Sequence, residues 1–396
     1  MTQWEVTTLG KLAKIKHGWP FKSEHLIEPG SGKPIVIGVG NFKYTGGFRF
    51  QETKLREYSG DFPEEYILSA GDILLIMTCQ TEGGEILGIP GIIPYDGRTY
   101  LHNQRLGRVI VTNRQKVLPS FLYWYFLTKE FNQQLVGSAS GTKIVHTAPS
   151  RIEACDITLP SLSEQGVISA LLGGIDEKID LLHRQNQTLE TMAETLFRHW
   201  FLESENEGWH QKPLSSIANF LNGLACQKYP PANDVDKLPV LKIRELSNGI
   251  TDSADWATSQ VKPDYIVEAG DVIFAWSASL MVKVWDGQKC VLNQHLFKVT
   301  SREFPKWFYL RWCKHHLAEF ITISASQATT MGHIKRGDLD AAMVLVPPPT
   351  VLDAMSQQMT PLLDKQIEIG RQRKTLEKLR DTLLPKLMSG EVRVAC

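Results

Sequence analysis

The chain has 396 residues, of which 42% are hydrophobic and 22% are charged, and its formal net charge is zero. This length and composition predict a globular protein of two or three domains with a sizeable core. Zero net charge argues against a protein that holds nucleic acid through a uniformly basic surface, but it leaves a local basic patch open.

The first half of the chain predicts a mixed globular part followed by a long helix. Strand-forming residues flanked by turn residues mark three segments, 33–42, 71–78 and 107–112. Residues 119–136 are typical of a helix, which Ser120 would open after Pro119. A longer helix is expected over 173–201. The acidic stretch 203–209 has the composition of a solvated joint.

The second half predicts the same kinds of element in the same order. Strands are expected at 239–243, 270–276 and 295–300, followed by a helix over 305–321. A second long helix should begin at Pro361, because proline is favoured at the first helical position. Pro385 indicates an end or a kink. The fold class is therefore α+β, with a strand order that the pattern does not define.

Short motifs recur in an unbroken order, which indicates an internal repeat. The distance between paired motifs falls gradually from 205 to about 187 residues, and chance matches would not stay collinear. We infer two copies of one module, residues 1–205 and 206–396. The pairs are Gly18 with Gly223, Gly71-Asp72 with Gly270-Asp271, Asn103-Gln104 with Asn293-Gln294, the Ser-Ala-Ser segments from Ser138 and Ser324, and the Thr-Leu-Glu segments 188–190 and 375–377.

Both long helices carry apolar residues at coiled-coil spacing. In the first, intervals of four and three residues run over more than three heptads, with one polar interruption at Asn186. The second has a sparser stripe, which Leu379 and Leu387 would extend and which Gly370 should weaken. The predicted seam consists of Ile175, Ile179, Leu182, Asn186, Leu189, Ala193, Leu196, Leu362, Ile369, Leu376 and Leu383.

Charge favours pairing of the two helices with each other. Residues 175–207 hold eight acidic and three basic residues, whereas residues 362–388 hold seven basic and four acidic residues. The alternative is that each helix covers only its own globular part. An antiparallel pair about 39 Å long, at ~1.5 Å per residue, would be close to one turn of duplex DNA, about 34–36 Å. Two different DNA-binding modules held by such a helix pair would contact two separate stretches of one duplex.

The order of these motifs resembles the specificity subunits of type I restriction-modification enzymes over essentially the whole chain. The most specific segments are "LPSLSEQ", which enters the central helix, and "LLPKLMSGEVRV" near the end. The resemblance implies two target recognition domains, residues 1–160 and 206–347. It also implies two helical regions, residues 161–205 and 348–396, paired as an antiparallel coiled coil with a pseudo-twofold internal repeat.

The resemblance further implies a subunit without catalysis of its own. Each recognition domain would read one half of a bipartite site in double-stranded DNA. Two modification subunits would methylate adenine with S-adenosylmethionine, and restriction subunits that use ATP and Mg²⁺ would join the complex. No cofactor would be bound by this chain. In agreement, the sequence lacks an Asn-Pro-Pro-Tyr or Asp-Pro-Pro-Tyr segment and a P-loop.

Candidate DNA contacts lie on paired polar loops, because hydroxyl, amide and basic side chains reach base edges and phosphates. Ordinary polar surface loops are the alternative interpretation. The candidates are Lys16, Lys22, Gln80, Thr81, Ser140, Thr142, Lys143 and His146 in the first copy, and Gln227, Lys228, Ser277, Ser279, Gln327, Thr329, Thr330, His333 and Lys335 in the second.

The six cysteines are scattered and include no Cys-x-x-Cys pair, which indicates neither a disulfide framework nor a metal site. No apolar run approaches the ~18 residues of a membrane-spanning helix, and the start "MTQWEVTTLG" lacks a secretion pattern. We therefore expect a cytoplasmic protein with no membrane partner.

Two other functions stay open. The chain could be an adaptor that joins protein partners through its two modules. It could also serve a single enzyme in which methylase and nuclease are fused. Exchange of one module, or the neighbouring genes, would separate these possibilities.

Overall fold

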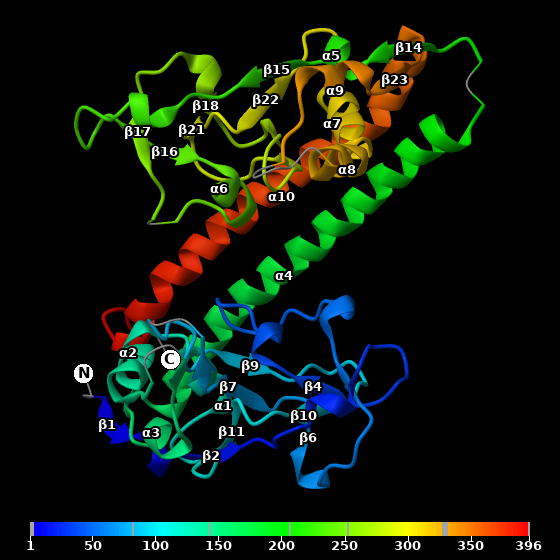
Figure 1. Ribbon diagram of the computed structural model, residues 1–396. Coiled ribbons are helices and arrows are strands. Elements are labelled where there is room, and N and C mark those ends of the chain that lie inside the picture. The colour runs from blue at the N-terminus through cyan, green and yellow to red at the C-terminus, as the bar shows by residue number, and fades with distance from the viewer. Residues whose placement is uncertain are drawn as a thin grey trace. The chain divides into compact units, whose positions relative to one another are not determined.

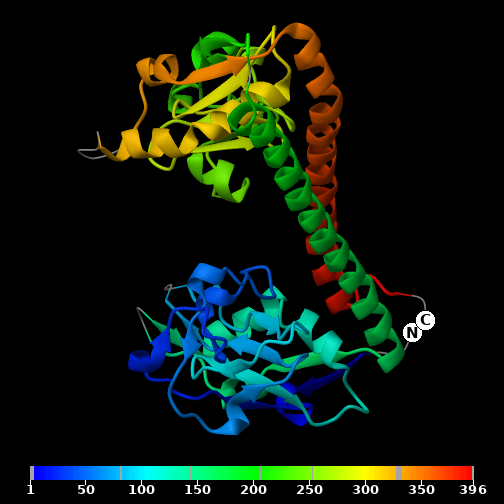
Figure 2. The ribbon, with the colours of Figure 1, turned by 90° about the vertical axis from the view of Figure 1, so that its right-hand side faces the viewer.

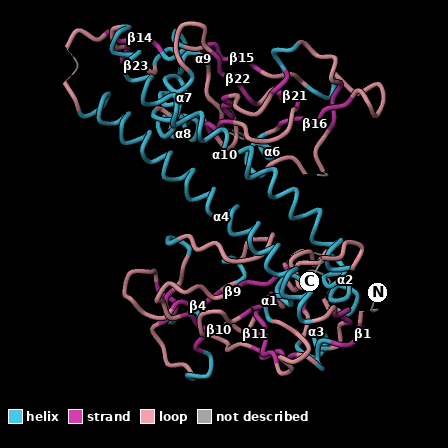
Figure 3. Tube along the Cα trace, turned by 180° about the vertical axis from the view of Figure 1, so that it is seen from behind, coloured by secondary structure: helices cyan, strands magenta, loops and turns pink. Residues whose placement is uncertain are grey.

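The chain forms two compact units, each with its own core. The computed structural model describes residues 4–80, 83–141, 144–205, 207–251, 253–326 and 332–394. Unit 1 comprises Met1–Asp176 and Leu379–Cys396, and unit 2 comprises Glu177–Lys378. Both units mix helices and strands (Figures 1 and 3). Among the described residues, no helix has the length and apolarity needed to cross a membrane.

Unit 1 is built on two main sheets. One has four antiparallel strands in the order β2 (Ala13–His17), β11 (Leu106–Val111), β7 (Ile73–Ile76) and β9 (Pro90–Ile92). The other has the order β3 (Leu26–Ile27), β5 (Glu57–Tyr58), β4 (Ile35–Ile37), β10 (Tyr100–His102) and β6 (Ile67–Leu68). Two short pairs join β1 (Glu5–Thr8) to β13 (Asp156–Leu159) and β8 (Thr78–Cys79) to β12 (Val145–His146).

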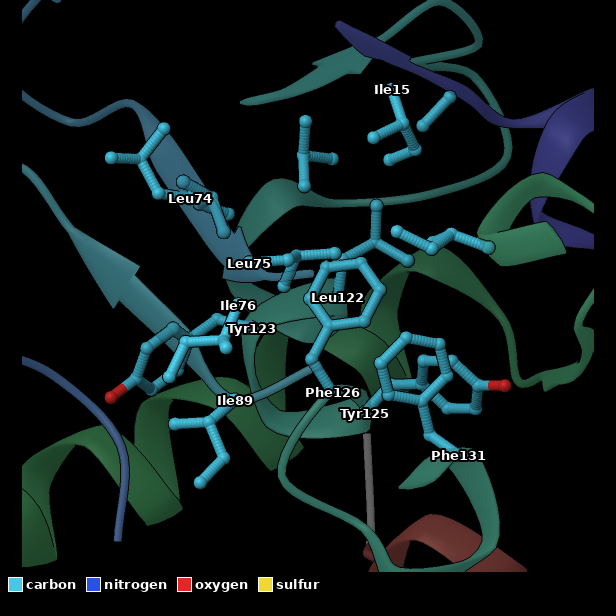
Figure 4. Packing of buried hydrophobic residues seen from close by; sticks show 14 of the residues in the cluster. Ile15, Leu74, Leu75, Ile76, Ile89, Leu122, Tyr123, Tyr125, Phe126 and Phe131 are labelled. Atoms are coloured by element: carbon cyan, nitrogen blue, oxygen red, sulfur yellow. The ribbon is translucent and has the colours of Figure 1, made fainter. Parts of the chain in front are cut away.

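The helix predicted over 119–136 is two helices, α1 (Pro119–Tyr125) and α2 (Lys129–Ser138). Thr128 ends one and begins the other. Its hydroxyl donates to the Tyr125 carbonyl at 2.7 Å and accepts from the Phe131 amide at 3.3 Å. The break brings the Phe126 and Phe131 rings together, with centroids 5.0 Å apart, in a core that also contains β7 side chains (Figure 4). A short helix, α3 (Pro149–Glu153), follows.

Unit 2 repeats this plan. Its four-stranded antiparallel sheet has the order β15 (Asn219–Asn222), β22 (Leu296–Thr300), β19 (Val272–Ala275) and β20 (Met281–Val284). Its second sheet has the order β17 (Trp256–Thr258), β16 (Lys237–Leu241), β21 (Cys290–Leu292) and β18 (Ile266–Val267). β14 (His210–Pro213) pairs with β23 (Met343–Val346), as β1 pairs with β13. The predicted α+β class and internal repeat are confirmed.

The helices of unit 2 are also shorter than the sequence pattern indicated. The segment predicted as one helix over 305–321 is α7 (Lys306–His315) and α8 (Leu317–Ser326), with His316 closing the first. The remaining short helices are α5 (Leu214–Ile217), α6 (Ile243–Asn248) and α9 (Arg336–Ala341).

The two long helices extend further than predicted. α4 covers Leu162–Arg198 and continues into a π-helical turn at His199–Glu203. α10 covers Pro349–Ser389, so the predicted start at Pro361 is wrong, and Pro385 lies within the helix. Pro349, rather than Pro361, is the proline at the first helical position. Met355, Met359 and Leu363 of α10 are buried in the unit 2 core, and this packing outweighs the hydrogen bond lost at Pro361.

All the predicted seam positions are buried or half-buried in the structure. Ile179, Leu182, Ala193 and Ile369 are buried; Ile175, Asn186, Leu189, Leu196, Leu362, Leu376 and Leu383 are half-buried. Leu379 does not extend the stripe, because it is 44% exposed.

The predicted antiparallel pairing of α4 with α10 is confirmed within each unit. In unit 1, Asp176 of α4 accepts a hydrogen bond from Arg380 at 2.6 Å, while Glu164, earlier in α4, binds Arg393, further along the chain. In unit 2, Glu190 accepts from the Gln366 amide at 3.0 Å. Figure 2 shows the unit 2 segments running in opposite directions.

Gly370, expected to weaken α10, has a packing role instead. A Cβ at this position would lie 3.0 Å from the Asp286 Cβ. The glycine therefore lets α10 approach the β20–β21 loop closely, where Arg373 binds the Asp286 carboxylate at 2.7 Å.

Glu190 joins three helices of unit 2. Its carboxylate accepts two hydrogen bonds from Arg311, at 2.8 and 2.9 Å, and one from Lys314 at 2.6 Å, in addition to that from Gln366. Burial opposes ionisation, but Lys314 and Arg311 outweigh it and lower the pKa of Glu190 to about 2. This carboxylate thus fixes α4 and α10 against α7.

Replacing Glu190 with Gln should lower the free energy of unfolding of unit 2 by about 2 kcal/mol at pH 7, because Arg311 loses a charged partner. The carboxyl has a lower pKa folded than unfolded, so its contribution is complete above about pH 4.5 and is lost as the pH falls toward 2. Denaturant titrations across that range measure the deficit.

The matched control is Glu177→Gln, since Glu177 is an exposed acid of α4 with no side-chain partner among the described residues. Equal losses in both variants, or a deficit for Glu190→Gln that does not shrink with acid, would contradict this assignment.

Candidate nucleic-acid interface

A glycine packs against an Asn-Gln turn in unit 1. The Trp19 amide donates to the His102 carbonyl at 2.8 Å, and the Gln104 amide donates back to the Trp19 carbonyl at 2.9 Å. A Cβ on Gly18 would lie 2.1 Å from the Asn103 carbonyl oxygen, so no other residue fits without movement of the turn. The turn is thereby held at the end of β2.

Unit 2 repeats this contact almost atom for atom. The Leu224 amide donates to Leu292 at 2.9 Å, and the Gln294 amide donates to Leu224 at 2.8 Å. A Cβ on Gly223 would lie 2.2 Å from the Asn293 carbonyl oxygen. The paired glycines and Asn-Gln motifs of the sequence are therefore two sides of one backbone contact.

The Gly-Asp motifs fix the start of the neighbouring strand. In unit 1, Asp72 accepts from the Ser69 amide at 2.7 Å and pairs with Arg108 at 3.0 Å. In unit 2, Asp271 accepts from the Glu268 amide at 2.9 Å and pairs with Lys298 at 2.8 Å. Equivalent aspartates thus tie β7 to β11 in unit 1 and β19 to β22 in unit 2.

The structure brings together the two polar loops that the sequence singled out in each copy. In unit 1, β8 pairs with β12, and the Thr78 hydroxyl lies 3.1 Å from His146 Nδ1. In unit 2, Ser277 forms a β-bridge with His333, and the Ala278 amide donates to Gly332 at 2.8 Å. In each pair one loop directly follows the central strand, β7 or β19, and the other loop meets it there from a distant part of the chain.

Several predicted contact residues have other partners. Lys16 binds the Glu65 carboxylate at 2.7 Å and lies over the Tyr66 ring. Ser140 accepts from Arg151 at 3.2 Å. Ser277 is only 4% exposed and its hydroxyl lies 3.1 Å from His295 Nδ1, so it positions that ring.

The remaining candidates divide into exposed residues and residues that are not described. Lys22, Gln80, His146, Gln227, Lys228, Ser279 and Lys335 are exposed, and His333 is half-buried. Thr81, Thr142, Lys143, Gln327, Thr329 and Thr330 lie outside the described residues. The contact assignments of all these residues stay predictions.

The structure adds residues that the sequence analysis did not select. In unit 2, Trp276 donates to the Asn222 side-chain oxygen at 3.2 Å, and its ring contacts His295 and His333 at centroid distances of 6.0 and 6.3 Å. In unit 1, Arg105 occupies the place of His295. The sequence offered one signal for Arg105 and His295: each directly follows one of the paired Asn-Gln motifs.

His102 hydrogen-bonds across the unit 1 turn. The ring is 1% exposed, and its Nε2 donates to the Leu106 carbonyl at 2.9 Å. Burial disfavours the charged ring and lowers the pKa of His102 to about 4. The same place in unit 2 is held by Leu292, which cannot titrate.

Comparison with known proteins gives consistent matches. A family model described as the type I restriction modification DNA specificity domain matches residues 1–191 and 206–378. The MjaIX specificity subunit of Methanocaldococcus jannaschii is 26% identical over 303 residues, which cover 70% of each chain. The HindI specificity subunit of Haemophilus influenzae is 18% identical over 84% of this chain and 95% of the relative.

A solved structure shares the fold. The type I restriction-modification system S subunit from M. genitalium has a TM-score of 0.61 and 15% identity, and the match covers 98% of this chain and 99% of that chain.

Gly18→Ala should destabilise unit 1 by more than about 2 kcal/mol, because the new methyl group meets backbone rather than a movable side chain. Gly40→Ala in the same unit meets nothing within 4 Å and should change the free energy of unfolding by less than about 0.5 kcal/mol. Thermal and denaturant unfolding measure both; similar values would refute the close contact.

His102→Leu should flatten the acid dependence of unit 1 stability. In the wild type the unfolded chain takes up a proton near pH 6.5 and the folded chain near 4, so stability falls by about 3 kcal/mol as the pH drops across that interval. His146→Leu, at an exposed position of β12 in the same unit, is the control. Parallel pH profiles of the wild type and His102→Leu would contradict a neutral buried ring.

Proposed function

The chain belongs to the type I restriction modification DNA specificity family, and from this premise we propose that its two specificity domains read the two halves of a bipartite DNA site. The observation that carries the proposal is the shared frame of the two copies. Equivalent backbone hydrogen bonds hold the loops in both units, while the side chains on them differ: Arg105 and Thr78 in one copy, His295 and Ser277 in the other.

An equivalent backbone with different side chains suits two domains that bind different half-sites in one protein–DNA complex. Phosphate contacts position a protein on the duplex, whereas side chains at base edges specify sequence. A common frame would present each loop set to DNA in the same way. Different side chains on that frame would select different half-sites.

We further propose that α4 and α10 set the spacing of the half-sites. α4 has 37 residues and α10 has 41, which correspond to about 55 and 60 Å at ~1.5 Å per residue. Each helix contributes residues to both units. Helices of this length exceed one turn of duplex DNA, which measures about 34–36 Å, so a site with a non-specific gap between its halves is the expected target.

The partners in this proposal are two modification subunits, with restriction subunits added to them. The chain itself is taken as non-catalytic, and S-adenosylmethionine, ATP and Mg²⁺ would be used by those partners. Exposed apolar residues of α4 support a docking role for the helices: Leu171, Leu181 and Met192 are 41%, 39% and 48% exposed. A cytoplasmic location forms part of the same proposal.

Exchanging residues 1–160 for the corresponding module of a relative should change one half of the methylated motif and leave the other half intact. The assay is the complex of the exchanged chain with its modification subunits, with methylated positions read across a genome. A contiguous motif for the wild-type complex would overturn the bipartite proposal. Methylation that needs no such chain would favour a protein adaptor.

A further inference from the structure

We propose that Arg105 and His295, which follow the two Asn-Gln pairs, are specificity-determining residues of their half-sites. This inference rests on the proposed function and adds the residues that make one half differ from the other. Its basis is a tight turn with the same backbone, and a different outward side chain, in each copy.

The turn has the same hydrogen bonds in both units. The Leu106 amide donates to the Asn103 carbonyl at 3.0 Å, and the Leu296 amide donates to the Asn293 carbonyl at 3.0 Å. Arg105 and His295 are therefore the third residues of equivalent four-residue β-turns. The Gln104 and Gln294 amides pin these turns to the segments after β2 and β15. Such anchoring fixes the backbone from which the two side chains project.

The turn also lies next to the polar loops. The Met77 amide donates to the Arg105 carbonyl at 2.9 Å, and the Trp276 amide donates to the His295 carbonyl at 3.4 Å. One residue further along each strand end stand Thr78 and Ser277, whose hydroxyls lie 3.1 Å from histidine Nδ1 atoms. Three segments distant in sequence thus meet at one end of each four-stranded sheet.

Arg105 is available to a ligand. Its side chain is exposed, and among the described residues no acceptor binds its guanidinium. The neighbouring Gln104 side chain is exposed as well. An arginine with free donors can form two hydrogen bonds with O6 and N7 of guanine in the major groove. We assign Arg105 to a guanine in the half-site of the first copy.

The second copy offers different chemistry at the same place. His295 is half-buried, with Nδ1 3.1 Å from the Ser277 hydroxyl and Nε2 3.4 Å from the side-chain Nε2 of Gln294. Trp276 and Asn222 stand beside it, where unit 1 has Met77 and His17. A fixed imidazole within an aromatic and amide cluster cannot reproduce the bidentate contact of arginine. The two turns should therefore select different bases.

The test compares Arg105→Ala with Arg114→Ala in the complete complex with its modification subunits. Both arginines flank β11, one directly before it and the other three residues after its end, and both are exposed. Arg105→Ala should reduce discrimination at one base pair of one half-site by roughly 5- to 150-fold. Arg114→Ala should leave the methylated motif unchanged.

A reciprocal pair strengthens the test. Arg105→His and His295→Arg should each alter preference at a single position, in opposite half-sites. Circular dichroism and thermal unfolding confirm that the variants are folded.

The outcomes separate the inference from the function on which it rests. Arg105→Ala could instead weaken binding to all sequences alike and reduce the slope of log K against the logarithm of the salt concentration by about 1. The residue would then contact phosphate, and the inference would be overturned. An unchanged motif also overturns it. If the wild-type complex itself methylates no split site, the proposed function fails instead.

Discussion

The contact between a glycine and the carbonyl of an Asn-Gln turn is the constraint on which both globular units depend. At Gly18 and Gly223 the backbone approaches so closely that a Cβ would overlap the asparagine carbonyl. This approach fixes the end of β2 or β15 against the turn that leads into the neighbouring strand, β11 or β22. The polar loops after β7 and β19 are then positioned by hydrogen bonds to the same turn. A rigid backbone contact thus leaves the outward side chains free to differ.

The pairing of the two long helices differs from this pattern, because it depends on different polar contacts in unit 1 and unit 2. Unit 1 uses Asp176 with Arg380 and Glu164 with Arg393, whereas unit 2 gathers Arg311, Lys314 and Gln366 around Glu190. The repeat equivalent of Glu190 is Glu377, whose carboxylate binds Lys374 within its own helix. Apolar seams alone would accept several registers. Unlike polar partners in the two units favour one pairing of α4 with α10.

Much of this organisation was accessible from the sequence, because collinear repeats and heptad spacing report on topology directly. The pattern did not reveal the breaks at Thr128 and His316, where tertiary packing of aromatic rings overrides continuous helical composition. The predicted helix start at Pro361 was wrong for a related reason, since a well-packed helix of 41 residues tolerates the donors missing at Pro361 and Pro385. At the candidate interface the paired loops could be chosen from their polar residues. Arg105 and His295 follow motifs that the sequence pairs, but their place beside the loops could not be predicted, because only the fold brings the turn to the ends of those loops.

Unit 1 combines residues that precede unit 2 in the chain with residues that follow it. Leu387 and Met388 are buried in its core, Arg393 binds Glu164, and the Trp4 ring lies 5.2 Å from the Arg393 guanidinium. The ribosome therefore releases every residue of unit 2 before unit 1 has its final side chains. A nascent chain would keep an apolar opening in its first module until residues 387–393 have been synthesised. Removal of these residues would therefore destabilise a core that is built mainly from the first 176 residues.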